Sequence, residues 1–313
     1  MRWINCSPSF RGRQLPAPFF YIYVRKFRRG IMNTIDITKP LSVPELKQVA
    51  VQMRKDILYM IYEAQAGHPG GSLSATDIVT ALYFRIMRID PTNPAWEERD
   101  RFILSKGHAC PVWYAALANR GYYDRSHLST LRKLNSILQG HADMKKTPGV
   151  DMTVGSLGQG ICAGVGMALG ARFQKKDFHV WVVLGDGEMQ EGSVWEAAMS
   201  AAKWKLDNMT VILDLNRIQN DDFVENTMPL GNVKEKWEAF GWNTICINGH
   251  DMQAVVDALE EATTIKGVPT IVIADTVKGK GVSFMENVPA WHGAAPNTEQ
   301  YEQAVREVSE VLA

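Results

Sequence analysis

The chain has 313 residues, and its 46% hydrophobic content is enough to bury one large α/β domain or two small ones. Its 34 basic and 34 acidic residues balance, but seven basic and no acidic residues fall within 1–31, which leaves 27 basic against 34 acidic residues, a net charge of −7, in the remainder. The net negative charge of residues 32–313 gives no support for nucleic-acid binding. No apolar run is long enough to cross a membrane. The four cysteines are scattered and form no CxxC pair, which does not suit a zinc site.

Residues 1–31 differ in composition from the rest of the chain. They are basic and aromatic and show neither helical nor strand periodicity. Their apolar run, 19–24, is too short to span a bilayer and precedes a basic cluster, the reverse of a secretory signal. We interpret Met32 as the natural start and 1–31 as a non-native or disordered extension, although a targeting peptide or a membrane-surface arm would have a similar composition. Residues 32–313 are then a single domain, expected in the cytoplasm.

Helical and strand-like hydrophobic patterns alternate along the rest of the chain. A first helix is predicted over 42–64, with Ser42 as N-cap and Glu45 at the capping-box position. The glycine-rich segment 67–71 is expected to break it, and 121–155 to form an irregular loop. Further helices are predicted over 74–87, 108–119, 158–173, 233–240 and 252–265, with one more beginning near residue 190. Strands are predicted over 101–104, 180–184, 209–215, 244–247 and 270–275. This alternation predicts an α/β fold: a doubly wound, mostly parallel sheet with helices on both faces.

Polar residues follow two of these predicted strands. Gly185-Asp186-Gly187 comes after strand 180–184, and Asn216 comes after strand 209–215. In a βαβ unit the two strand ends lie side by side, so the carboxylate and the amide oxygen can converge on one hard cation. Mg²⁺ takes about six oxygen ligands and usually shares them with a diphosphate. The pattern indicates a site for a metal–diphosphate, although a Gly-Asp-Gly after a strand is often only a tight turn.

Four further blocks occur in a fixed order around this motif. They are Gly67-His68-Pro69-Gly70-Gly71-Ser72, Asp100 to His108 (DRFILSKGH), Gly155-Ser156-Leu157-Gly158-Gln159-Gly160, and Trp291-His292-Gly293. Together with the metal motif, these blocks resemble the N-terminal half of transketolase over about residues 42–300. A generic thiamine enzyme would share only the metal motif. The resemblance implies that the bound diphosphate is thiamine diphosphate, which carries the difficult chemistry of two-carbon transfer.

The resemblance implies how the metal is held. Asp186 and Asn216 would be joined by the main-chain carbonyl of Ile218, giving Mg²⁺ three protein oxygens beside those of the diphosphate and water, with Ca²⁺ or Mn²⁺ as substitutes. The N–H of Gly187 would reach the diphosphate, and the helix beginning near Gln190 would add its positive end.

Other residues are assigned to the cofactor by the same resemblance. The main chain of Gly155, Ser156 and Leu157 would line the aminopyrimidine and thiazolium rings. Lys278 corresponds to a lysine on the cofactor side, although a glycine-bounded lysine can equally be an ordinary surface residue. Glu191 corresponds to an acid at the subunit interface, which communicates with a glutamate of the pyrimidine-binding domain that activates the cofactor. Alternatively, it is simply an acid favoured at a helix N-terminus.

Four of the seven histidines lie in the matched blocks. The resemblance implies that His68 and His292 face the reacting carbon and the sugar hydroxyls, that His108 contacts the diphosphate side, and that His141 lies in the donor channel. Histidine suits these tasks because its pKa allows hydrogen bonding and proton transfer near neutral pH. His250 is assigned no chemistry, since Asp251 after it is expected to cap a helix.

No residue of this chain matches the glutamate that activates the pyrimidine ring, which in transketolases belongs to a second domain. The resemblance therefore implies a partner, a C-terminal transketolase subunit that carries the pyrimidine-binding domain, in an assembly of two copies of each chain (α2β2). With that partner the chain would transfer a two-carbon ketol unit from a ketose phosphate to an aldose phosphate. Alone it should be inactive. Sugar phosphates are the expected ligands, with neither nucleic acid nor membrane as partner.

Four other interpretations remain open. The enzyme could be specialised for a branched or sulfonated sugar, which neighbouring genes would indicate. It could be the α subunit of a decarboxylating dehydrogenase, which shares the metal motif but not the other blocks. A nucleotide-binding Rossmann module is a poor match, because Gly164, Gly166 and Gly170 lie inside a predicted helix with the wrong spacing. A non-catalytic paralogue would not need to keep Asp186, Asn216 and the four histidines.

Overall fold

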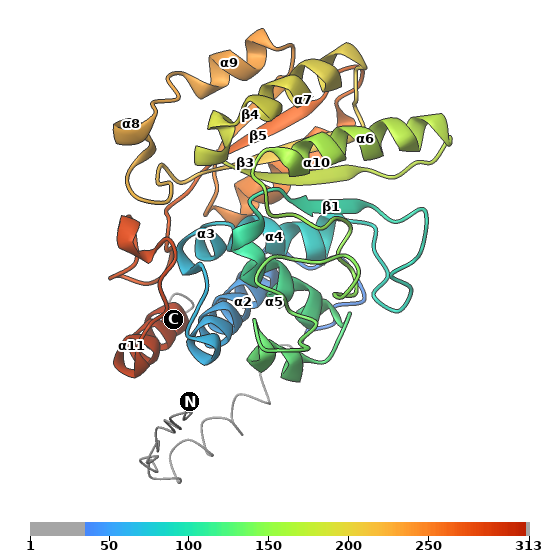
Figure 1. Ribbon diagram of the computed structural model, residues 1–313. Helices are drawn as coiled ribbons and strands as arrows, with labels where there is room; N and C mark the ends of the chain where they lie inside the picture. Colours follow the sequence, from blue (N-terminus) through green and yellow to red (C-terminus); the bar gives the residue numbers. More distant parts are fainter. Residues whose placement is uncertain (1–34, 311–313) are drawn as a thin grey trace, which may run out of the picture.

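The computed structural model describes residues 35–310, and these form an α/β domain around one parallel sheet (Figure 1). Its five strands lie in the order β1-β2-β3-β5-β4. Their bounds are β1 Arg101–Leu104, β2 Val180–Gly185, β3 Met209–Leu215, β4 Asn243–Asn248 and β5 Thr270–Asp275. The predicted strands and the doubly wound parallel arrangement are confirmed. The interpretation of 1–31 as an extension lies outside the described residues.

Helices cover both faces of this sheet. Figure 1 shows α6, α7 and α9 on one side and α2 to α5 on the other. The α-helices are α2 Val43–Ala64, α3 Pro69–Ser74, α4 Thr76–Ala81, α5 Cys110–Arg120, α6 Gln159–Phe173, α7 Gly192–Lys203, α8 Val224–Thr227, α9 Val233–Ala239, α10 Met252–Thr264 and α11 Thr298–Glu310. Shorter turns of other helical types are η2 Leu82–Ile86, η3 Gly107–Ala109, η4 Arg125–Thr130, η5 Gly187–Gln190 and η6 Pro289–Trp291.

The register of β2 and β3 places the metal motif at one edge of the sheet. Val180 pairs with Met209 and Gly185 with Asp214, in parallel along the whole length of both strands. The residues that follow, Asp186 and Asn216, therefore leave the sheet at the same end. Ligands of open parallel sheets bind outside this carboxyl end.

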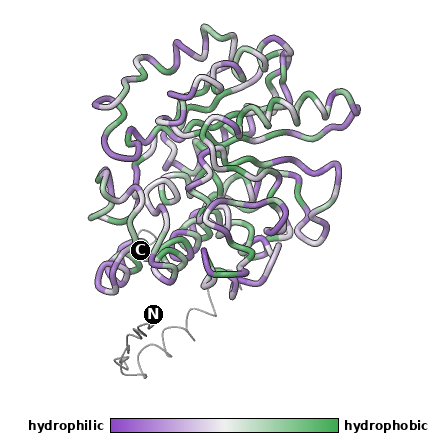
Figure 2. The backbone as a smooth tube through the Cα atoms, in the orientation of Figure 1, coloured by the Kyte–Doolittle hydropathy of each residue, from purple (hydrophilic) through white to green (hydrophobic). Residues whose placement is uncertain are grey.

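Apolar side chains hold the layers together. Hydrophobic segments gather along the sheet and the helix faces that pack on it, while the outer loops are hydrophilic (Figure 2). Three indole rings are almost fully buried, those of Trp113, Trp181 and Trp237. Within residues 35–310, none of the helices combines the length and the hydrophobicity that crossing a bilayer requires.

The prediction of a helical break over 67–71 and a second helix over 74–87 was wrong in its bounds. A helix already starts at Pro69, stops after Ser74, and resumes over α4 and η2. Proline is favoured in the first turn of a helix, where its missing N–H costs nothing. The Ser72 hydroxyl donates to the His68 carbonyl (2.7 Å), which further supports this turn. Gly70 and Gly71 are thus helical residues rather than a linker.

Both predicted helix caps are present. Ser42 and Glu45 form the capping box of α2, and the Asp251 carboxylate accepts hydrogen bonds from the first turn of α10. The helix expected near Gln190 begins at Gly192, because the turn η5 comes first. The sequence patterns predict neither α8 nor α11.

Candidate functional site

Asp186 and Asn216 lie where the sheet register places them, and both are buried, at 2% and 4% exposure. One Asp186 carboxylate oxygen accepts the Gly187 N–H (2.8 Å), and the other accepts the Arg217 N–H. The N–H of Gly187, expected to reach a diphosphate, is therefore bonded to the neighbouring carboxylate. Burial, followed by the negative charge of Asp214, raises the pKa of Asp186 to about 6. A cation would relieve this electrostatic cost.

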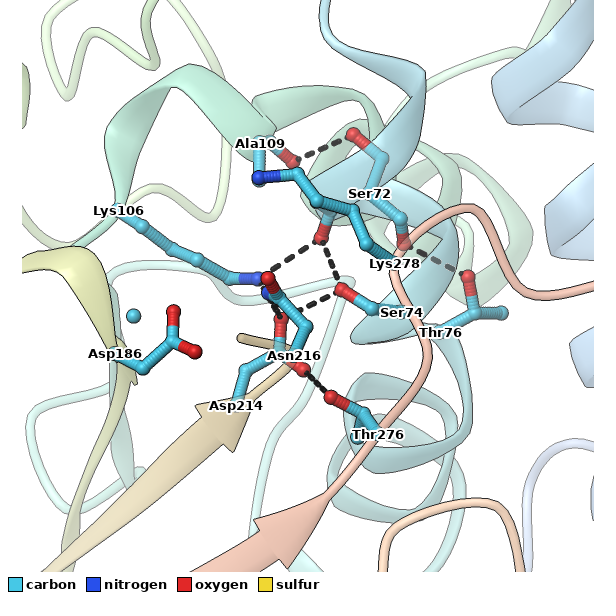
Figure 3. A network of polar contacts seen from close by, with 12 residues as sticks. Ser72, Ser74, Thr76, Lys106, Ala109, Asp186, Asp214, Asn216, Thr276 and Lys278 are labelled. Atoms are coloured by element: carbon cyan, nitrogen blue, oxygen red, sulfur yellow. Dashed lines mark hydrogen bonds and ion pairs between the residues drawn. The ribbon is translucent and has the colours of Figure 1, made fainter. Parts of the chain in front are cut away.

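Asp214, which the sequence did not single out, organises the floor of the site. It is fully buried at the end of β3 and accepts hydrogen bonds from Ser74 Oγ (2.6 Å), Thr276 Oγ1 and Lys106 Nζ. Figure 3 shows these partners converging on it, with Asp186 beside the network. Lys106 also donates to the Gly71 carbonyl (2.9 Å). Lys106 and Asp214 thus form a buried ion pair next to Asn216, one of the predicted metal ligands.

This network orients the Asn216 amide. The Asn216 Nδ2 group donates to Asp214 Oδ2 (3.0 Å), while Asn216 Oδ1 accepts the Ile218 N–H (3.2 Å). The amide nitrogen of Asn216 is therefore occupied by its hydrogen bond to the Asp214 carboxylate. The oxygen, which is the atom that can ligate a hard cation, is held on the other side.

Lys278 is not a surface lysine, because it is only 2% exposed. Its ammonium donates to the Ile218 carbonyl (2.6 Å) and to His292 Nδ1 (2.7 Å). Burial and the neighbouring Lys106 lower the pKa of Lys278 to about 8. The segment carrying it packs tightly against α3, since a Cβ on Gly70 would lie 2.9 Å from Lys278 Cγ and 3.0 Å from the Trp291 carbonyl oxygen.

Three of the predicted histidines form one cluster. The ring centroids of His68 and His292 are 5.5 Å apart, and His108 lies 5.1 and 5.0 Å from these two rings. Burial, followed by nearby positive groups, lowers the pKa of His68 to about 4 and that of His292 to about 3, and it depresses the pKa of His108 as well. All three are neutral at pH 7 in this environment. His141 is exposed, and its ring lies beside Gly155.

One cavity of ≈ 500 Å³ joins these features. Of the thirteen predicted site residues, eleven line it: His68, His108, Gly155, Leu157, Asp186, Gly187, Glu191, Asn216, Ile218, Lys278 and His292. Ser156 and His141 are not in its wall. Glu191 is an exposed residue just before α7, so its side chain is accessible from the cavity mouth.

The cavity suits a metal–diphosphate cofactor. Its volume is within the range usual for small-molecule sites, and it combines oxygen ligands at Asp186 and Asn216 with the positive charge of Lys106 and Lys278. In addition, the buried His68 Nδ1 has no hydrogen-bond partner among the described residues. A buried polar atom without a partner is costly, and one facing a cavity can be satisfied by a ligand.

Comparison with known protein families identifies the family to which this chain belongs. The profile of "Transketolase, thiamine diphosphate binding domain" matches residues 46–309, which is most of the chain. The chain belongs to the transketolase family. Its fold is that of a transketolase thiamine diphosphate-binding domain.

Two relatives in the family are covered almost completely. The chain is 42% identical to an apulose-4-phosphate transketolase subunit of Phocaeicola vulgatus, over 86% of this chain and 96% of that protein. It is 44% identical to a 6-deoxy-6-sulfo-D-fructose transketolase subunit of a Clostridium species, over 84% of this chain and 96% of that protein. Among solved structures, the transketolase of Campylobacter jejuni superimposes with a TM-score of 0.80 and 34% identity, over 84% of this chain and 42% of that one. The chain thus spans about two fifths of this solved transketolase.

The sequence analysis does not identify the buried pair of Lys106 and Asp214, which contacts Asn216. Lys106 belongs to the block from Asp100 to His108, but lysines in glycine-rich turns are usually exposed, so the block alone does not predict a buried lysine. Asp214 stands in an apolar run, where a carboxylate that is not paired would not be tolerated. That second fact is a usable signal: a charged residue inside a buried strand indicates a charged partner elsewhere.

Proposed function

We propose that the chain is the thiamine diphosphate-binding subunit of a two-chain transketolase. It would transfer a two-carbon ketol unit from a ketose phosphate to an aldose phosphate. The observation that carries the proposal is the convergence of eleven predicted site residues on the wall of one cavity, although they come from blocks spread over residues 68–292. A scaffold that had lost its chemistry would not need this convergence.

The proposal gives each part of the cavity a task. Asp186, Asn216 and the Ile218 carbonyl would hold Mg²⁺, and diphosphate oxygens would complete its set of ligands. Lys106 and Lys278, which both line the cavity, would offset part of the charge of the diphosphate. When bound, thiamine diphosphate supplies the nucleophilic carbon that the reaction requires.

The neutral histidines would handle the sugar. His68 and His292 present uncharged imidazoles, which can donate to or accept from hydroxyl groups and can move a proton. Gly155 and Leu157 would contact the cofactor rings through the main chain, with Ser156 in the same turn. His141, exposed beside Gly155, would meet the donor as it enters.

A separate partner chain is part of the proposal. Two relatives named as transketolase subunits match the chain over nearly their whole length, whereas the transketolase of Campylobacter jejuni is matched over 42% of its length. The partner would bring the carboxylic acid that activates the pyrimidine ring. Because each cofactor would lie between the two kinds of chain, we propose a heterotetramer with two copies of each.

The experiment is to assay ketol transfer between sugar phosphates with thiamine diphosphate and Mg²⁺. The purified chain is tested alone and together with the product of an adjacent reading frame of similar size. Activity should require both chains, and an Asp186→Ala variant should assemble with the partner yet stay inactive. Full activity from the single chain would refute the two-chain proposal.

A second candidate concerns the donor. The two relatives are named for apulose 4-phosphate and for 6-deoxy-6-sulfo-D-fructose, which favours specialisation of this chain as well. The assembled enzyme should then prefer one of these donors over xylulose 5-phosphate by at least tenfold in kcat/KM. Equal use of all donors would support a general transketolase.

A further inference from the structure

A buried carboxylate, that of Glu188, connects three segments of the site. Glu188 lies in η5, two residues after Asp186, and is 3% exposed. One of its oxygens accepts from Ser105 Oγ (2.5 Å) and from the Gly158 N–H (2.8 Å). The other accepts from the Gly185 N–H (3.0 Å). These donors come from the ends of β1 and β2 and from the start of α6.

Each bonded segment continues into a different part of the cavity. Gly185 immediately precedes Asp186, at the end assigned to the metal and diphosphate. Gly158 closes the turn that starts at Gly155, at the end assigned to the cofactor rings. Ser105 precedes Lys106, which holds the floor of the site through Asp214. One carboxylate therefore fixes the distance between the two ends of the site.

Only a carboxylate can serve all three donors. An ionised carboxylate accepts at both oxygens and carries no hydrogen, whereas a glutamine amide has one oxygen and one NH₂ group. Whichever way the amide is turned, its NH₂ faces either the Gly158 N–H or the Gly185 N–H. One backbone donor then loses its acceptor in a buried place.

The Gly158 side of this connection has little freedom. Gly158 has a φ of 80°, a left-handed conformation that favours glycine, and a Cβ there would collide with Ser193 Oγ. The turn 155–158 thus depends on tertiary contacts for its position. The bond from the Gly158 N–H to Glu188 is such a contact.

We propose that Glu188 is a positioning residue that holds the ring-binding turn in register with the metal–diphosphate end of the cavity. This inference rests on the proposed function, because it assumes that thiamine diphosphate spans both ends. Glu188 itself lines the cavity, and in this role it acts through the main-chain groups of Gly158 and Gly185.

The test compares a ligand that spans both ends with one that occupies a single end. The complex of the full chain with its partner subunit is titrated with thiamine diphosphate and, separately, with inorganic pyrophosphate, each with Mg²⁺, by isothermal titration calorimetry up to millimolar ligand. In Glu188→Gln the Kd of thiamine diphosphate should rise at least tenfold, while that of pyrophosphate should change less than about twofold. Unequal loss is the signature of lost register, because simple destabilisation would weaken both ligands alike.

Two further variants make the result decisive. Glu188→Asp keeps the charge and withdraws the carboxylate by one methylene, so it should change the ratio of the two Kd values in the same direction if Glu188→Gln does not fold. Asp56→Asn is the matched control, because Asp56 is also a buried carboxylate with three side-chain donors (Gln52, Asn119 and Arg125) and lies outside the cavity wall. It should lower the thermal midpoint and leave the ratio unchanged.

The outcomes separate the two proposals. A wild-type complex that binds both ligands, with Glu188 variants that keep the wild-type ratio, would overturn the role of Glu188 alone. A wild-type complex of the chain with its partner that shows no Mg²⁺-dependent binding of thiamine diphosphate would overturn the proposed function together with it.

Discussion

Replacing Asp214 by Asn should destabilise the domain strongly. Asp214 is fully buried and Lys106 is 3% exposed, so the pair has almost no contact with water. The substitution removes the charge that compensates the ammonium and turns an NH₂ group toward donors, among them Ser74 Oγ at 2.6 Å. Removing the charge of one partner from a buried ion pair lowers the free energy of unfolding by about 3–5 kcal/mol. This is a large share of the about 5–15 kcal/mol by which a typical domain is stable.

Urea denaturation followed by circular dichroism measures this loss. Asp214→Asn should lower the free energy of unfolding by about 3–5 kcal/mol. The exposed Asp257→Asn, on the surface of α10, should change it by less than about 0.5 kcal/mol. Lys106→Met should cost less in the Asp214→Asn background than in the wild type, because the ammonium there has already lost its partner. A loss below about 1 kcal/mol for Asp214→Asn, or strict additivity of the two changes, would refute the buried pair as the floor of the site.

Three further predictions concern other parts of the domain. Asp186→Ala should abolish the Mg²⁺-dependent part of thiamine diphosphate binding while leaving the circular dichroism spectrum unchanged; unaltered Mg²⁺ dependence in calorimetry would contradict this. Burial lowers the pKa of His179 to about 3, so between that value and its ordinary 6.5 only the unfolded chain takes up this proton. The contribution of neutral His179 to the free energy of unfolding is therefore complete above pH 6.5 and is lost as the pH falls. Between pH 7.5 and 5 the free energy of unfolding of the wild type, measured in urea titrations, should fall by up to about 2 kcal/mol more than that of His179→Gln. Parallel pH profiles of the two proteins would contradict the lowered pKa of His179. Gly158→Ala should lower the thermal midpoint and weaken thiamine diphosphate binding, because a Cβ at a φ of 80° would collide with Ser193; calorimetric and thermal values equal to those of the wild type would show that the turn is adaptable.

Local patterns predicted most of what determines the place of the site. Short apolar runs identified all five strands, and the positions of Asp186 and Asn216 after two of them predicted that these residues emerge together. The parallel register of β2 and β3 confirms that step. It depends on backbone geometry alone, which is why sequence suffices for it.

What the sequence could not predict depends on contacts between distant segments. Lys106 and Asp214 are 108 positions apart, and neither residue type signals the other. Whether Lys278 was a surface residue was settled by packing against α3 and Ile218, which no local pattern encodes. The sequence does not predict the helix that starts at Pro69, because adjacent glycines usually break a helix, whereas here Ser72 and the proline support the turn.

His250 illustrates the same limit in a residue that was set aside. Its Nδ1 lies 2.9 Å from Asp77 Oδ2, and its Nε2 accepts the Val277 N–H (2.9 Å). Asp77 is itself paired with the buried Arg54. The imidazole thus anchors the segment that carries Lys278.

The most direct test of the central claim is a crystal structure of the chain, with its partner subunit, grown with thiamine diphosphate and Mn²⁺. Anomalous scattering locates the ion independently of the protein coordinates. We predict one peak within coordination distance of the Asp186 carboxylate, Asn216 Oδ1 and the Ile218 carbonyl, with the diphosphate on its other side. A peak elsewhere, or a diphosphate bound outside the ≈ 500 Å³ cavity, would contradict the account.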